Sequence, residues 1–257
     1  MKLGGFGFIK DYDEIKKAGF DYAELDMPEI EQLDEKAFDT FCRHVEEAAF
    51  PIPNGARILP ITEPLFFRPD FKETDLESYL KSTCKKSGQL GIRQILFGNG
   101  KARQLIDEDS IKREDAFIRF LRMLCEIAGE NGQDILIEPL GPKYSNYINT
   151  LPQAAEVIAK ADMPNLFAMA DLRHFVWSGE PFEDVVTYKE LVHHVHIDYP
   201  TSYPERNYPN VNDDYDYAPF FEQLKGYDGT LTIEADVPSD WMRAGVDARE
   251  LLKAYRK

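Results

Sequence analysis

The chain has 257 residues, and its 30 lysine and arginine residues against 46 aspartate and glutamate residues give a formal net charge of −16. Nucleic-acid binding depends on basic patches that neutralise phosphates, and no basic run occurs in this sequence, so we expect no nucleic-acid partner. No apolar run reaches the roughly 18 residues of a membrane helix, and charge resumes at Lys10 after a short apolar start, so we expect neither a membrane partner nor a signal sequence.

Short apolar segments alternate along the chain with longer amphipathic segments. Strands buried on both faces read as short apolar runs, whereas amphipathic helices repeat their apolar residues every three or four positions. On this basis we predict strands at residues 3–9, 22–27, 56–61, 94–98, 134–140, 166–171, 192–198 and 230–236. We predict helices at residues 12–18, 35–49, 76–90, 111–128, 151–161, 182–190, 217–224 and 247–255.

This alternation predicts an α/β protein built as a single (β/α)8 TIM barrel over residues 1–257. Barrels of roughly 250 residues fold around one core, and no linker or repeat divides the chain. The alternative is an open doubly wound sheet, but no glycine-rich dinucleotide fingerprint follows the first predicted strand. The cysteines Cys42, Cys84 and Cys125 are far apart and odd in number, so we expect reduced thiols and a cytoplasmic protein.

Charged or imidazole side chains mark the ends of the last four predicted strands, where the active site of a barrel lies. Glu138, Asp171, His196 and Glu234 occupy equivalent places in four successive units. One such residue alone is ordinarily a solvated strand end, but a charge within an apolar strand costs on the order of several kcal/mol unless it is paired or bound to a metal. We therefore expect the four side chains to hold one divalent metal ion. The donor set suits Mn²⁺ first, and Mg²⁺, Co²⁺ or Zn²⁺ as alternatives.

The sequence resembles the xylose isomerase-like superfamily of sugar isomerases and epimerases. Weak similarity covers nearly the whole chain, and the specific motifs are Ile137-Glu138-Pro139, Asp171-Leu172-Arg173-His174, His194-Val195-His196 and Ile233-Glu234. The resemblance implies that Glu138, Asp171, His196 and Glu234 are metal ligands, that Glu138 and Glu234 are also the catalytic acid/base pair, and that His174 holds a substrate oxygen. We also expect Arg206, His194 and Trp177 to bind substrate.

Within this superfamily the sequence is most similar to ketose 3-epimerases and hydroxypyruvate isomerase-like proteins. The similarity implies a metal-dependent isomerase or epimerase that removes a proton next to the carbonyl of a sugar or sugar phosphate and passes through a metal-stabilised enediolate. Asp198-Tyr199-Pro200 departs from the epimerases, which carry a Gly-Glu pair there, so the identity of the sugar stays open. The loop at residues 199–210, rich in tyrosine and proline, is expected to shape or cover the substrate pocket.

Several alternatives stay open at this point. An inosose dehydratase-like lyase belongs to the same superfamily, and a non-catalytic sugar- or metal-binding protein would keep the ligands. Endonucleases that cut at abasic sites use a three-zinc cluster with further histidines, but His44 is the sole histidine before residue 174, which disfavours a nuclease. The segment at residues 98–103 offers backbone amides, Lys101 and Arg103 to a phosphate. Assembly into a homo-oligomer is also left open.

Overall fold

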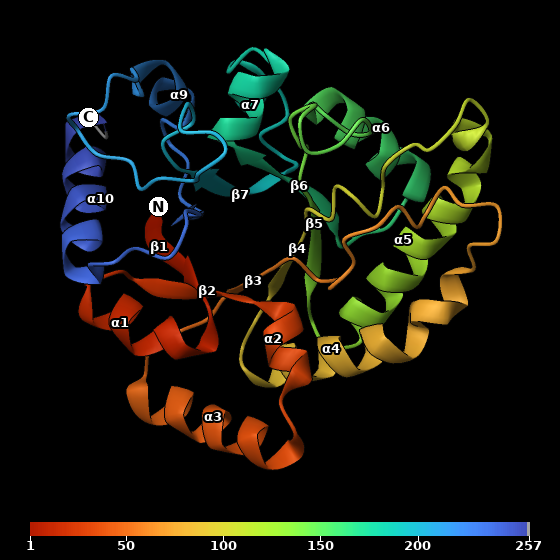
Figure 1. The fold of residues 1–257 in the computed structure, drawn as a ribbon, viewed down its shortest axis with the longest axis horizontal. Coiled ribbons are helices and arrows are strands. Elements are labelled where there is room, and N and C mark those ends of the chain that lie inside the picture. Colours follow the sequence, from red (N-terminus) through yellow and green to blue (C-terminus); the bar gives the residue numbers. More distant parts are fainter. Residues whose placement is uncertain (256–257) are drawn as a thin grey trace.

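Eight parallel strands close into a barrel in sequence order, with β8 pairing back onto β1 (Figure 1). The computed structural model describes residues 1–255. The predicted TIM barrel is therefore confirmed. The strands are β1 (Lys2–Gly7), β2 (Tyr22–Asp26), β3 (Asn54–Ala56), β4 (Gln94–Phe97), β5 (Asp134–Ile137), β6 (Leu166–Asp171), β7 (Val192–Ile197) and β8 (Thr230–Ile233).

Helices surround the barrel on its outer side (Figure 1). They are α1 (Tyr12–Lys17), α2 (Met27–Gln32), α3 (Glu35–Ala48), α4 (Glu77–Gln89), α5 (Glu114–Gly129), α6 (Leu151–Ala161), α7 (Leu172–Ser178), α8 (Asp184–Thr187), α9 (Ala218–Gln223) and α10 (Trp241–Tyr255). Short 3-10 turns lie at Ile9–Asp11, Glu73–Leu76 and Ser110–Arg113. Along residues 1–255, none of the helices combines the length and the apolar character that crossing a membrane requires.

The third predicted strand, at residues 56–61, is wrong. Strand β3 covers Asn54–Ala56 and ends there because Arg57 adopts a left-handed backbone with a φ of 53°. This turn directs the Arg57 side chain back to Asp26, where Nε donates to Oδ1 at 2.8 Å. Ile58 and Leu59 are still fully buried, so the apolar run is a core segment that does not pair as a strand.

Two short helices were missed because each starts directly at a strand end. Asp26 closes β2 and its carboxylate accepts from the Glu29 amide at 3.3 Å, which starts α2. In the same way Asp171 closes β6 and accepts from the Arg173 amide at 2.7 Å, which starts α7. A side chain that accepts a hydrogen bond from the first-turn amides is a normal helix start. Helix α10 also begins earlier than predicted, at Trp241 instead of residue 247.

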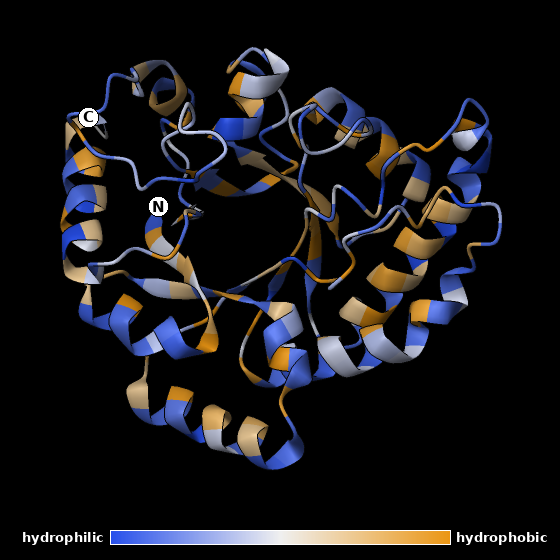
Figure 2. Ribbon diagram, in the orientation of Figure 1, coloured by the Kyte–Doolittle hydropathy of each residue, from blue (hydrophilic) through white to orange (hydrophobic). Residues whose placement is uncertain are grey.

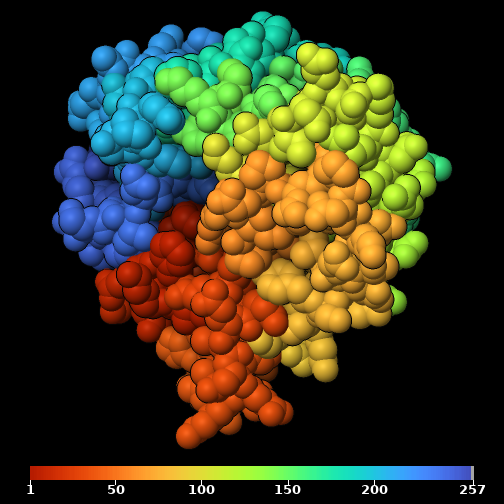
Figure 3. Space-filling model, turned by 45° about the vertical axis from the view of Figure 1, so that its right-hand side comes forward, coloured from red at the N-terminus to blue at the C-terminus, as the bar shows by residue number. Residues whose placement is uncertain are grey.

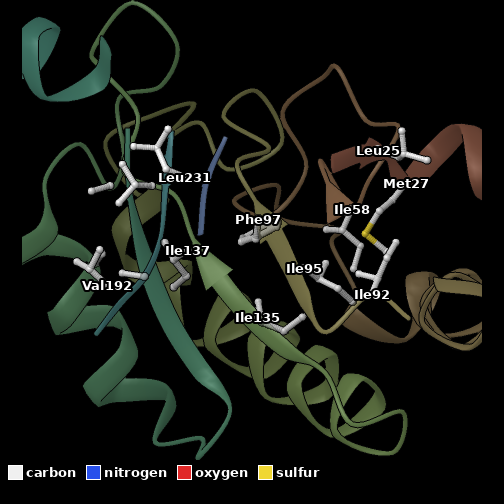
Figure 4. Close-up of a cluster of buried hydrophobic side chains, with 14 of the residues drawn as sticks. Leu25, Met27, Ile58, Ile92, Ile95, Phe97, Ile135, Ile137, Val192 and Leu231 are labelled. Atoms are coloured by element: carbon white, nitrogen blue, oxygen red, sulfur yellow. The ribbon is translucent and has the colours of Figure 1, made fainter. Parts of the chain in front are cut away.

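The main apolar core lies between the strands and the outer helices. Ile95, Phe97, Ile135 and Ile137 are fully buried members of it, as Figure 4 shows for strands β4 and β5. The helices carry both apolar and polar residues along their length (Figure 2), as expected of amphipathic segments that cover a sheet. Helix α3 projects farthest from the barrel (Figure 3). A second, small cluster inside the barrel consists of Leu96, Leu136 and Met169. Successive side chains of a strand point to opposite faces, so these residues point inward while their neighbours along the strand point outward.

Candidate metal centre

Four acidic or imidazole side chains from β5 to β8 converge at one end of the barrel. The donor atoms that Glu138, Asp171, His196 and Glu234 offer all lie within 4.8 Å of one another. Asp171 and His196 stand opposite each other in the pairing of β6 with β7, while Glu138 and Glu234 directly follow β5 and β8. The structure thus brings together all four residues that the sequence proposed as ligands.

The donor set fits a divalent cation. Glu138 Oε1 and His196 Nδ1 are buried without a hydrogen-bond partner. Glu234 Oε2 also accepts no hydrogen bond, although it lies in ion-pair contact with Arg206. Buried polar atoms normally form hydrogen bonds, so these three neighbouring atoms, which form none, are suited to bind a shared ion. Three carboxylates and one imidazole are a donor set for a hard or borderline divalent metal.

Glu24, at the centre of β2, holds two of the three histidines of β7. The His196 Nε2 atom lies 2.9 Å from Glu24 Oε1, and His194 Nε2 lies 2.9 Å from Glu24 Oε2. Thr232 donates to the same Oε2 at 2.8 Å. Burial by itself would raise the pKa of this carboxyl, but the nearby His196 and His194 outweigh it and hold the pKa well below its usual range. A carboxylate behind a ligating histidine orients the ring and fixes which nitrogen faces the metal.

His174, on α7, faces the same centre. Its Nε2 atom lies 3.5 Å from Glu138 Oε1 and 3.7 Å from Asp171 Oδ2, and its Nδ1 is buried without a partner. The ring packs edge-on against Tyr144 with centroids 4.9 Å apart. Burial would raise the pKa of Asp171, yet the nearby His174, Arg206 and His196 keep it well below the ordinary range. Asp171 is therefore ionised while it also starts α7.

Arg206, on the loop after β7, joins the carboxylates of three residues. Its guanidinium lies 2.8 Å from Asp171 Oδ2 and 3.0 Å from Asp198 Oδ2, and it also contacts Glu234. Asp198 is fully buried and is held by Arg173 as well, whose Nε donates at 2.5 Å. Arg173 further donates to the backbone oxygens of Tyr199 and Glu205 at 3.1 and 3.0 Å. Arg173 and Arg206 thus fix the loop after β7, which carries Arg206 into the site.

A cavity of about 430 Å³ opens above these side chains. Glu138, His174, His196, Arg206 and Glu234 form part of its wall, together with Ala56, Arg57, Leu96, Gly98, Gly100, Lys101, Leu140, Lys143, Tyr144 and Tyr203. Gly98 leaves room for the Glu138 carboxylate, because a Cβ atom at residue 98 would stand 1.9 Å from Glu138 Oε2 and displace it. Tyr203 places the loop at residues 199–210 on this wall, where the sequence expected it.

Two of the expected substrate contacts lie elsewhere. His194 is fully buried below His196, where its Nδ1 lies 2.7 Å from Thr230 Oγ1, and it does not belong to the cavity wall. Trp177 is also outside the wall, and its Nε1 donates to the Pro200 oxygen at 3.1 Å. Both side chains instead support residues of the wall from behind.

Arg103 does not offer a cation to a phosphate, because its side chain turns into the protein. It is fully buried and donates to the backbone oxygens of Phe97 and Ile148 at 3.2 and 3.3 Å, and also to that of Glu138. Burial lowers the pKa of this guanidinium to about 10. Of the two cations that the sequence placed in the segment at residues 98–103, only Lys101 reaches the cavity.

Sequence reasoning missed Glu24, Arg57, Lys143 and Tyr144. Glu24 carried a usable signal, since it is a charge within the apolar run Tyr22-Ala23-Glu24-Leu25, the same feature that identified the four ligands. Lys143 and Tyr144 lie in a loop with no repeating pattern, and their place depends on how that loop folds back over β5.

Comparison with known proteins gives the same family. A sequence model described as Xylose isomerase-like TIM barrel matches residues 12–256. A putative hydroxypyruvate isomerase of Xenopus laevis is 30% identical over 67% of this chain and 64% of its own length, which is less than two thirds. A 3-dehydroshikimate dehydratase of Bacillus anthracis is 24% identical over 73% of this chain and 71% of its own length.

Solved structures share the fold. A D-psicose 3-epimerase structure superimposes with a TM-score of 0.82 at 16% identity and covers 100% of this chain and 98% of its own. A 3-keto-D-glucoside 4-epimerase from E. coli gives a TM-score of 0.79 at 19% identity, with 99% of both chains covered. The family match spans nearly the whole chain, and we conclude that this protein belongs to the xylose isomerase-like TIM barrel family.

Proposed function

We propose that this protein is a divalent-metal-dependent isomerase or epimerase that acts on a sugar or sugar phosphate next to its carbonyl group. The observation that carries the proposal is the convergence of four donor groups within 4.8 Å, at the buried end of a cavity of about 430 Å³. The names of the relatives, a putative hydroxypyruvate isomerase and two epimerases of sugar derivatives, support this reaction class.

Glu138, Asp171, His196 and Glu234 would hold the ion, and Mn²⁺ is the ion that we propose. When bound, it supplies Lewis-acid stabilisation of the negative charge that develops when a carbon next to a carbonyl loses its proton. Glu24 keeps His196 oriented with Nδ1 towards the carboxylates, because Glu24 Oε1 accepts a hydrogen bond from His196 Nε2, which lies 2.9 Å away.

Glu138 and Glu234 are the proposed acid/base pair. They follow β5 and β8, so they stand on different walls of the cavity, and each reaches it. A base on each side of a carbon allows removal of its proton from one face and return to the other, which is epimerisation. Return on the same face at the next carbon is isomerisation, which either glutamate can perform.

His174 and Arg206 are proposed to hold substrate oxygens. His174 has a buried Nδ1 without a partner, and its ring lines the cavity. Arg206 places a guanidinium beside Glu234 and Asp171, where it adds a fixed positive charge. A fixed charge in a site with little water stabilises developing oxyanions well.

A dehydratase is the second candidate, and the relative named 3-dehydroshikimate dehydratase favours it. Elimination of water starts with the same proton removal, followed by departure of a hydroxyl group from the neighbouring carbon. The same glutamates could take the proton, and His174 could protonate the leaving hydroxyl.

Solvent-deuterium exchange tests the proposal. The Mn²⁺-loaded protein is incubated in D₂O with a panel of ketoses, their phosphates and short hydroxy-oxo acids, and products are separated by chromatography. We expect deuterium at the carbon next to the carbonyl and a new isomer or epimer, whereas a dehydratase would yield an unsaturated product instead. Bound metal without any exchange would indicate a binding protein, and absence of metal after purification without chelator would overturn the proposal.

A further inference from the structure

We infer that the substrate is a small anion whose carboxylate or phosphate group is bound by Lys101 and Lys143 at the outer end of the cavity. The inference deepens the proposed function, since it rests on that reaction for what happens at the metal centre. Binding of the anionic group itself depends only on the two lysines.

The cavity has a buried acidic end and an exposed basic end. Glu138, His174 and His196 are buried, whereas Lys101 and Lys143 are exposed residues of the same wall. Lys101 lies on the loop after β4 and Lys143 on the loop after β5, and these are neighbouring strands. A substrate that reaches the metal ligands at one end therefore meets two ammonium groups at the other.

Neither of these two lysines is neutralised by a carboxylate. Some lysines on the outer surface meet carboxylates, as Lys81 does with Glu77 and Lys160 does with Glu114, both at 2.6 Å. Lys101 and Lys143 form no ion pair with any carboxylate in the part of the chain that the structure describes. Their ammonium groups, which stand together on the wall of one cavity, are therefore available to an anion that enters it.

Aromatic rings fix Lys143 without neutralising it. Its Nζ atom lies 3.4 Å from the centroid of the Trp177 ring and 4.1 Å from that of Tyr203. A cation–π contact holds an ammonium group in place but leaves its full charge available, unlike a carboxylate partner. Trp177 is itself tied to the Pro200 oxygen, so the residue expected at the substrate acts here as a positioning residue for Lys143.

The loop that carries Lys101 is held from inside. Asn99 donates to the Leu59 oxygen at 2.7 Å and accepts from the Leu59 amide at 3.3 Å. A Cβ atom on Gly100 would stand 2.6 Å from Leu140 Cδ1, so this loop packs closely against the loop of Lys143. Both ammonium groups therefore stand on fixed backbone.

Other cations hold the carboxylates around the cavity. Arg206 contacts Asp171, Asp198 and Glu234 at the buried end, and Arg57 on the outer wall is paired with Asp26 at 2.8 Å. Lys101 and Lys143 are thus left to meet a carboxylate or phosphate group of a ligand, which a neutral sugar does not carry.

Calorimetry on the Mn²⁺-loaded protein tests this inference. The probes are D-fructose, D-fructose 6-phosphate and hydroxypyruvate, with Lys101→Met and Lys143→Met as variants. Lys85→Met, an exposed lysine on α4 away from the cavity, is the control with the same change of charge. We expect one of the two anions to bind more tightly than D-fructose, and each cavity variant to weaken that binding on the order of ten- to a hundredfold. The anion that shows this dependence tells a carboxylate from a phosphate.

Turnover separates this inference from the proposed reaction. For an anionic substrate we expect KM to rise in both cavity variants while kcat changes little, because the lysines bind ground and transition states alike. Trp177→Leu should raise KM as Lys143→Met does, and Trp177→Phe should restore most of the binding. Deuterium exchange into D-fructose with unchanged KM in the lysine variants would overturn the anion site and keep the reaction. Lysine-dependent anion binding without exchange into any probe would overturn the reaction and keep the anion site.

Discussion

The Nε2 atom of His196 lies 2.9 Å from Oε1 of Glu24, below the cavity and out of reach of solvent. This contact reserves the other ring nitrogen, Nδ1, for the centre formed by the carboxylates, where Glu234 Oε2 is 3.2 Å away. A residue of β2 that does not line the cavity thus controls how His196, the proposed ligand from β7, is oriented.

Substitution Glu24→Gln should weaken metal binding. The glutamine amide would oppose one of the two histidine N–H groups with its own N–H, so His196 would lose its orientation. Loss of such an outer partner typically costs about 10- to 100-fold in metal affinity. Competition with a chromophoric chelator measures this affinity. Thr232→Val, which removes one donor but keeps the carboxylate, should change it far less, and an unchanged affinity in Glu24→Gln would contradict the assigned role.

Substitutions Glu138→Gln and Glu234→Gln should each abolish proton transfer. The amide keeps the size of the side chain and one oxygen donor but cannot accept the proton, and loss of a general base costs roughly 10²- to 10⁴-fold in rate. Deuterium exchange gives the rate, and elemental analysis shows whether the metal is retained. Glu222→Gln on the surface of α9 serves as the control. Wild-type exchange in either cavity variant would remove that glutamate from the mechanism.

Substitution Arg206→Met should destabilise the fold as well as the site. Burial raises the pKa of Asp198 to about 6 even though the neighbouring Arg206 and Arg173 oppose the rise. Removal of one partner from a buried ion pair costs about 3–5 kcal/mol when the remaining charge has no other partner, and since Arg173 still holds Asp198 we expect a loss towards the lower end of that range. Denaturant unfolding measures the loss, and Arg243→Met, whose ion pair with Asp247 is exposed on the arginine side, should cost much less. Equal stability of the two variants would show that Arg206 supports only the substrate.

Glu180 should make stability depend on pH near neutrality. Its carboxyl is nearly buried and accepts from the Leu151 amide at 2.6 Å, and burial, aided by the nearby Asp184, raises its pKa to about 8. In the unfolded chain a glutamate titrates near ~4.3, so the folded state binds the proton more tightly. Protonated Glu180 therefore stabilises the fold fully below about pH 4.3, and this contribution to the free energy of unfolding is lost as the pH rises towards 8.

Substitution Glu180→Gln removes this loss and still offers an oxygen to Leu151. We expect the melting temperature of the variant minus that of wild type to grow as the pH is raised from 5 to 8. Calorimetric melting curves over that range measure the difference. Glu156→Gln, an exposed residue of α6, should leave the wild-type slope unchanged. A pH-independent difference between Glu180→Gln and wild type would show that the carboxyl is already ionised at pH 5.

The sequence predicted the bounds of strands and helices well where local signals mark both of their ends. Strand β6 and helix α6 have the predicted bounds, since an apolar run and a proline after a capping threonine mark them locally. Asp171 shows the limit of this pattern, because it is at once the last residue of β6, the side chain that caps α7 and a member of the proposed metal-binding set. The prediction of a strand at residues 56–61 was wrong because Arg57 adopts a left-handed backbone conformation, which a pattern of apolar residues does not reveal.

The centre was more predictable than the cavity around it. Glu138, Asp171, His196 and Glu234 are placed by strand ends, whose position follows from topology alone. The direction of Arg103, by contrast, depends on which carbonyl groups the folded loop leaves without partners. The position of Lys143 likewise depends on the rings of Trp177 from α7 and Tyr203 from the loop after β7.

The inward-facing Arg103 has a consequence for how this cavity could be redesigned. Because its guanidinium holds the backbone oxygens of Phe97, Glu138 and Ile148, the loop beside it keeps its course without help from Lys101. Exchange of Lys101 and Lys143 for neutral or acidic residues is therefore expected to alter which molecules enter the cavity while Glu138 keeps its position. Under the proposed function, substrate selection and proton transfer depend on different residues of these two loops, so selectivity can evolve while the four converging side chains stay in place.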